Sequence, residues 1–186
     1  MEIKKIFFMI AGPLIYTGIC IPTINAAERA DTQLNLRMEV AHITCLINDG
    51  AGINQQVYIP LASQDELRAG TAKSGLAKLL VDCSKSAVKP VAIKVNLIPE
   101  GGASVVGSGT DGILKTDLSG VALKVVWQSN GQPASLAIGN YTTFPASASD
   151  PLRWNVSLLV TPQYIQGEAI GKGNYKSALR VNVTYS

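Results

Sequence analysis

The sequence predicts an all-β sandwich in one domain. Short runs of Val, Ile, Leu and Thr alternate with polar residues, and Gly, Ser, Asn and Pro separate the runs. No long stretch has the periodicity of a helix, and no internal repeat or linker divides the chain. Closely spaced strands without intervening helices are typical of a sandwich. We expect strands at 32–40, 41–47, 57–61, 76–83, 91–98, 112–116, 121–128, 152–161 and 175–185.

Turn-forming residues lie between these runs. They cluster at 48–50, 99–102, 129–133 and 149–151, where Gly, Asn, Asp and Pro favour reversals of the chain. The segment 65–78 is compatible with one short helix or with a loop that leads into a strand.

The first 26 residues predict a secretory signal peptide. Lys4 and Lys5 provide a basic start, residues 6–21 are apolar, and Asn25-Ala26-Ala27 supplies small residues for cleavage. The apolar run has 21 − 6 + 1 = 16 residues and contains Gly12-Pro13, whereas a membrane anchor needs about 20 apolar residues. We therefore expect export and a mature chain of 186 − 26 = 160 residues.

Two cysteines, Cys45 and Cys83, remain after the signal peptide and its Cys20 are removed. An even count in an exported chain predicts a disulfide, and two buried free thiols are the alternative. Two cysteines and the single histidine, His42, are too few for a structural zinc site, so no metal or cofactor is expected.

Composition and motifs argue against nucleic-acid binding and catalysis. The net charge is +3, and the basic residues form no stripe with interleaved aromatics. His42 would have to serve any Ser-His-Asp or Cys-His site, and no nucleophile is marked by its local sequence. Residues 107–112 fit the dinucleotide pattern G-x-G-x-x-G, but the next segment, 113–120, is too short for the required helix and ends in glycine. No enzymatic activity is expected.

Two strands near the ends of the mature chain are strongly amphipathic. In the last strand, one face carries Tyr175, Ser177, Leu179, Val181, Val183 and Tyr185. Near the start, Thr32, Leu34, Leu36, Met38 and Val40 alternate with polar residues, and Cys45 comes soon after. Taken alone, this early strand is simply the first strand of the sandwich.

Together these features resemble the pilin subunits of chaperone–usher fimbriae of the type 1-like class, including small tip and adaptor pilins. The resemblance covers the mature chain, and its specific elements are the alternating arm before Cys45, the second cysteine at the end of an apolar strand, the penultimate Tyr185, and Gly173 fourteen places from the end. One departure is Met38, which stands where many pilins have a glycine seven residues before the first cysteine.

The resemblance implies an immunoglobulin-like sandwich that lacks its last strand and is completed by donor-strand exchange. It makes residues 27–40 a donor extension, with Thr32, Leu34, Leu36, Met38 and Val40 inserted into a neighbour, and residues 41–186 the pilin domain. Cys45–Cys83 becomes the disulfide of the family. The strand that lines the acceptor groove and contacts the chaperone carries Gly173, Tyr175, Leu179, Val181, Val183 and Tyr185.

The implied function is that of a structural subunit of a fimbria that supports cell adhesion. Its partners would be a periplasmic pilus chaperone, an outer-membrane usher and neighbouring pilins, and it would pass through the periplasm to the cell surface. The alternative is a complete secreted immunoglobulin-like binding module whose N-terminal arm folds onto its own domain. A small secreted enzyme is the least favoured interpretation.

Overall fold

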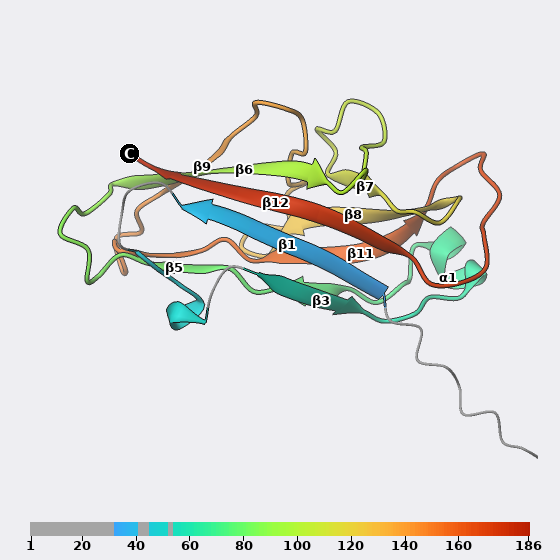
Figure 1. Cartoon of the computed structure of the whole chain (residues 1–186), viewed down its shortest axis with the longest axis horizontal. Helices are drawn as coiled ribbons and strands as arrows, with labels where there is room; N and C mark the ends of the chain where they lie inside the picture. Colours follow the sequence, from blue (N-terminus) through green and yellow to red (C-terminus); the bar gives the residue numbers. More distant parts are fainter. Residues whose placement is uncertain (1–31, 41–44, 52–53) are drawn as a thin grey trace, which may run out of the picture.

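The computed structural model describes residues 32–40, 45–51 and 54–186, and these residues are almost entirely β (Figure 1). The predicted signal peptide at 1–26, the first part of the extension at 27–31 and the segment 41–44 lie outside the described residues. Within the described part of the chain, no helix is long and apolar enough to cross a membrane.

The strands form a two-layered sandwich, which confirms the predicted all-β sandwich. One layer is a five-stranded sheet in the order β3-β1-β12-β6-β9. The strands of this layer are β1 (Thr32–Val40), β3 (Gln55–Ile59), β6 (Ala92–Glu100), β9 (Thr142–Pro145) and β12 (Lys176–Tyr185). The layers contact through their side chains: the rings of Trp127 and Phe144 meet edge to face, with 4.9 Å between their centroids.

The second layer consists of two smaller sheets, in the orders β4-β11-β8-β7 and β10-β5-β2. Their strands are β2 (Leu46–Ile47), β4 (Gly75–Ala77), β5 (Leu80–Asp82), β7 (Ile113–Lys115), β8 (Val121–Trp127), β10 (Arg153–Asn155) and β11 (Leu158–Tyr164). A single apolar cluster fills the space between the layers, and Leu123, Val125, Trp127, Leu158 and Leu179 are almost wholly buried in it.

Two predicted strands are each divided in the structure. The stretch 76–83 becomes β4 and β5, and the stretch 152–161 becomes β10 and β11. The divisions face each other: the Leu79 N–H donates to Ser157 Oγ (3.0 Å), and the Val156 N–H donates to the Leu79 carbonyl (2.9 Å). Both segments therefore pass from one small sheet to the other at the same point.

One strand was not predicted from the sequence. β9 lies at the edge of the large sheet, pairs with β6 alone, and contains Pro145. A proline within a short run argues against a strand unless that strand lies at an edge, and the sequence does not reveal the edge.

The ambiguous segment after residue 64 forms a short helix, α1 (Gln64–Ala69). Ser63 and Glu66 form a capping box, in which the Glu66 N–H donates to Ser63 Oγ and the Ser63 N–H donates to the Glu66 carboxylate. Gly70 ends the helix with φ 67°, a conformation that glycine adopts without strain. The rest of the predicted segment is a loop that leads to β4.

The predicted disulfide between Cys45 and Cys83 is present in the structure. It joins the residue before β2 to the residue after β5, and these two strands also pair with each other. The bridge closes a loop with a sequence separation of 38 residues.

Candidate functional site: a groove filled by the N-terminal strand

The first strand among the described residues lies inside the large sheet, between β3 and β12. β1 is parallel to β12 on one side and antiparallel to β3 on the other (Figure 1). Eight residues of β1, 33–40, are in register with residues 176–183 of β12, and residues 32–36 are in register with 59–55 of β3. Without β1, both β12 and β3 would expose an edge of unpaired backbone groups to solvent.

The inner face of β1 completes the apolar core. Leu34 has no exposed surface and Leu36 is only 3% exposed. Their neighbours in register include Val57 on β3 and Leu179 on β12, which are also buried. Burying each leucine is worth about 1.5–3 kcal/mol, so the arm contributes several kcal/mol before the cost of ordering it.

The outer face of β1 is polar, as the alternation predicts. Asn35 and Arg37 are exposed, and on the neighbouring β12 the Arg180 guanidinium pairs with the Glu100 carboxylate. At the groove, one face of the sheet is therefore buried in the core and the other is exposed to solvent. This restricts any inserted strand to registers that place its leucines in the core.

The strand beside the groove has the two-residue period expected from the sequence. Ser177, Leu179, Val181 and Val183 are buried, and the residues between them are partly or largely exposed. On its other side β12 pairs with β6 along its length, and at its end the Ser186 carbonyl accepts from the N–H groups of Val91 and Ala92. β12 is thus fixed in place by residues of its own subunit on the side away from the groove.

Gly173 and Tyr185, two C-terminal residues on which the resemblance rests, differ in their surroundings. Gly173 has φ +130°, and the space where a Cβ would lie is open, so the backbone conformation is what favours glycine there. The Tyr185 ring packs partly buried against the core, and burial raises the pKa of its hydroxyl above the ordinary value of 10.0.

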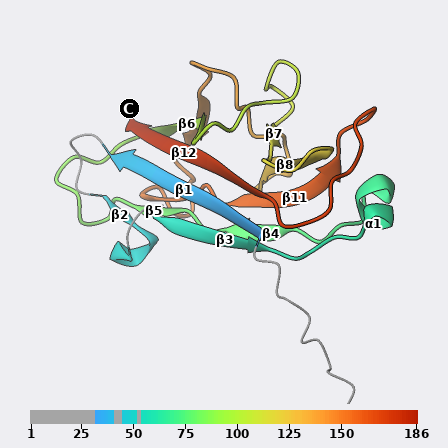
Figure 2. The ribbon, with the colours of Figure 1, turned by 45° about the vertical axis from the view of Figure 1, so that its right-hand side comes forward.

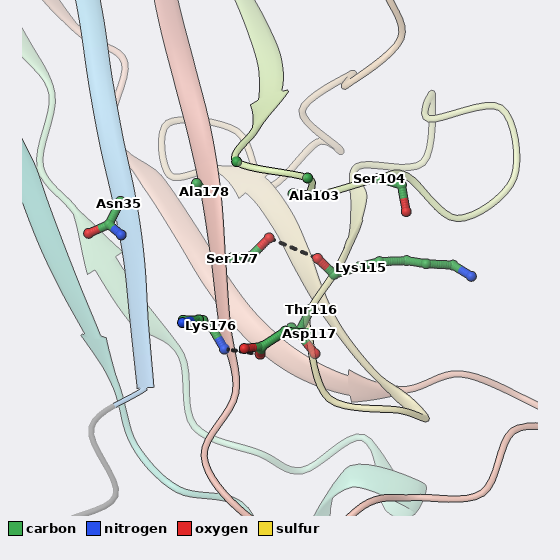
Figure 3. Close-up of a pocket in the computed structure, with 11 residues that line it drawn as sticks. Asn35, Ala103, Ser104, Lys115, Thr116, Asp117, Lys176, Ser177 and Ala178 are labelled. Atoms are coloured by element: carbon green, nitrogen blue, oxygen red, sulfur yellow. Dashed lines mark hydrogen bonds between the residues drawn. The ribbon is translucent and has the colours of Figure 1, made fainter.

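A hollow of about 310 Å³ lies where β12 begins, with Asn35, Lys115, Asp117 and Ser177 among its lining residues (Figure 3). The Lys176 N–H donates to the Asp117 carboxylate (2.8 Å), and the Asp117 N–H donates to the Lys176 carbonyl (3.1 Å). Ser177 Oγ donates to the Lys115 carbonyl (2.8 Å). These contacts tie the start of β12 to the opposite layer.

Among the described residues, no group of three or more His, Cys, Asp or Glu side chains is placed to hold a metal ion. The Lys115 side chain at the hollow in Figure 3 forms an ion pair at the surface, with its Nζ 3.7 Å from the Glu168 carboxylate. His42 lies outside the described residues.

The structure places the predicted donor strand directly beside the predicted groove strand. Leu34 and Leu36 on β1 lie in register with Ser177 and Leu179 on β12, although 177 − 34 = 143 positions of the chain separate the paired residues. The backbone of residues 32 and 38–40 belongs to β1, but only Gln33 to Arg37 have described side chains in this strand. Sequence reasoning did not find β3, the other wall of the groove, as a member of the site, because its five residues carry no distinguishing signal.

Comparisons with known proteins show a likeness to solved structures only. No family model matches the chain, and no curated protein matches it. Among solved structures, the chain is similar to the P pilus rod subunit PapA with a TM-score of 0.48 and 17% sequence identity, over 76% of this chain and 99% of that one.

Proposed function

We propose that this chain is a structural subunit of a bacterial surface fibre, a fimbria, that polymerises by exchange of its N-terminal strand. The observation that carries the proposal is the position of β1, which fills a groove between β3 and β12 and buries Leu34 and Leu36 there. β1 comes first among the described residues and lies between two strands built from later residues, which supports the proposal that it is a separable part of the fold.

The exchange follows from ordinary strand chemistry. The same strand from a second copy carries the same leucines and the same backbone donors and acceptors, so it satisfies the groove equally well. Repeated exchange between copies links subunits without any new type of contact. Donation is then a competition between a chain's own arm and that of its neighbour.

The proposed partners follow from the same groove. A subunit whose groove is empty exposes apolar core and an unpaired strand edge, which favours aggregation. We infer that a periplasmic pilus chaperone covers the groove before assembly, that an outer-membrane usher receives the complex, and that the fibre on the cell surface supports adhesion. The signal peptide expected at 1–26 provides the route of export.

A second candidate is a complete secreted immunoglobulin-like binding module. The observation that favours it is that β1 fills the groove of its own chain, so that a single copy already has a closed core. In that case the arm is a permanent strand, and the chain needs neither a chaperone nor a neighbour.

Periplasmic expression with and without a co-expressed pilus chaperone, followed by sizing, separates the two candidates. For a fimbrial subunit we expect a complex with the chaperone, and assemblies longer than a dimer once the chaperone is removed. A stable monomer that binds no chaperone at any concentration would support the binding module and overturn our proposal.

A further inference from the structure

The outer face of the large sheet has two polar hollows beside β1. β1 lies between β3 and β12 on the near side of the molecule, and no described element lies in front of it (Figure 1 and Figure 2). One hollow is that of about 310 Å³ where β12 begins, and the other, of about 490 Å³, includes residues 54–56 at the start of β3. Asn35 lines both hollows, so they are neighbours on this face.

Both hollows combine side chains of β1 with side chains from the rest of the chain. In the larger one, β1 supplies Asn35 and Arg37, β3 supplies Gln56, and the end of β6 supplies Glu100. In the smaller one, Asn35 is joined by residues of the opposite layer and of β12, among them Asp117 (Figure 3). The site is therefore complete only when β1 is paired in the groove.

The larger hollow offers both donors and acceptors of hydrogen bonds. Asn35, Asn54 and Gln56 are exposed, and each amide has a carbonyl acceptor and an NH₂ donor. The Glu100 carboxylate uses Oε1 to accept from the Arg180 guanidinium, which leaves Oε2 to accept from a ligand. Hydroxyl groups both donate and accept, so a ligand rich in hydroxyls matches this set of side chains.

An exposed aromatic side chain lies beside these amides. Tyr58 is 61% exposed, and it faces outward because its neighbours Val57 and Ile59 are buried. Its hydroxyl donates to Gln56 Oε1 (3.4 Å), at the edge of the larger hollow. A phenol ring has an apolar face and a polar edge, so it can pack against the C–H face of a sugar ring while the sugar hydroxyls reach the amides.

The charges around the hollows nearly cancel. Two ion pairs, Arg180–Glu100 and Lys115–Glu168, are each neutral. The other charged side chains that line the hollows are one acid and two bases: Asp117, Arg37 and Lys176. Their net charge is +2 − 1 = +1, which gives no strong attraction to a polyanion and fits an uncharged ligand.

We propose that these two hollows bind a neutral oligosaccharide, and that β1 and the body of the subunit share the site. Asn35 and Arg37 of β1 hold the ligand from one side, and Gln56 and Tyr58 of β3 hold it from the other. This inference does not rest on strand exchange, because the chain's own β1 completes the site. An arm from a second copy has the same side chains and completes it equally well.

Ligand binding and pairing of β1 are then thermodynamically linked. Because the site exists only when β1 is paired, a bound oligosaccharide stabilises the paired strand. A saturating oligosaccharide should therefore raise the melting temperature of the full chain.

The probe is a panel of immobilised neutral tri- and tetrasaccharides of hexoses and N-acetylhexosamines, with their sialylated counterparts and heparin as further arms. The full-length protein should bind at least one neutral oligosaccharide, and calorimetry then gives its affinity in solution. Binding to none of the neutral members, or to heparin and sialylated members alone, would overturn the inference.

A double variant tests whether β1 is part of the site. Asn35→Ala combined with Arg37→Ala should weaken binding by about tenfold or more, because it removes hydrogen bonds to the ligand. Its melting temperature without ligand should stay close to that of the wild type, since both side chains are exposed and Leu34 and Leu36 are intact. Gln128→Ala is the matched control: it removes an exposed amide that lines neither hollow. Equal affinity in the double variant and the control would place the ligand elsewhere and refute the shared site.

A pair of variants at Tyr58 tests the aromatic contact. Tyr58→Phe keeps the ring and should retain most of the affinity, whereas Tyr58→Ala should weaken binding by about tenfold. If Tyr58→Ala binds as tightly as the wild type, β3 does not contribute the ring and the proposed placement of the ligand is wrong.

Discussion

Replacing Leu36 with Asp tests whether the arm is a separable strand. Leu36 is 3% exposed, and its register partner on β12 is the buried Leu179. The change removes about 1.5–3 kcal/mol of apolar burial and adds the cost of an unpaired carboxylate in the core, which is several kcal/mol. Because domains are stable by only about 5–15 kcal/mol, the variant should lose most of its stability.

The informative assay is rescue by a strand supplied in trans. A synthetic peptide with the sequence of residues 30–41 should restore the melting temperature of the Leu36→Asp variant, since the groove itself is intact. Val181→Asp should not be rescued, because Val181 belongs to β12 and is completely buried in the body of the subunit. Asn35→Asp is the matched control and should change stability by no more than about 0.5 kcal/mol, because Asn35 is exposed.

Two results would refute this reasoning. If the peptide fails to rescue Leu36→Asp while it binds a subunit whose arm has been removed, the strand cannot be exchanged once the chain has folded. If the peptide rescues Val181→Asp equally well, its effect does not depend on the groove.

Three further predictions concern the body of the subunit. Cys83→Ser should lower the free energy of unfolding by about 4 kcal/mol, measured in urea, because the bridge to Cys45 closes a 38-residue separation; an unchanged midpoint would contradict this. Gly173→Ala should cost about 1–3 kcal/mol because φ is +130°, and a neutral result in thermal melts would show that the loop relaxes. The pKa of Asp82 is lowered from 3.8 to about 2, chiefly by hydrogen bonds from Ser84, so its stabilising effect is complete above pH 4 and is lost as pH falls toward 2. Asp82→Asn should therefore flatten the decline of the melting temperature between pH 4 and pH 2, and an identical decline in both proteins would refute the assignment.

The sequence by itself determined the class of the fold and the two amphipathic strands. Period-two alternation is a local property, so it identified the buried face of β12 and the strand at 32–40 without any knowledge of their partners. Cysteine count likewise predicted the Cys45–Cys83 bridge, because an exported chain with two cysteines has one intramolecular pairing available.

Only the tertiary structure decided which strands pair and in which direction they run. Nothing in the sequence indicates that β1 lies between β3 and β12, or that it is parallel to β12, because pairing between distant strands depends on the whole arrangement of layers. For the same reason the sequence did not predict the division at Leu79 and Ser157, where a side-chain hydrogen bond replaces a strand partner. A hollow of about 260 Å³ beside Leu61 also depends on tertiary structure, because its lining comes from three separate segments of the chain, 61–67, 118–121 and 170–175.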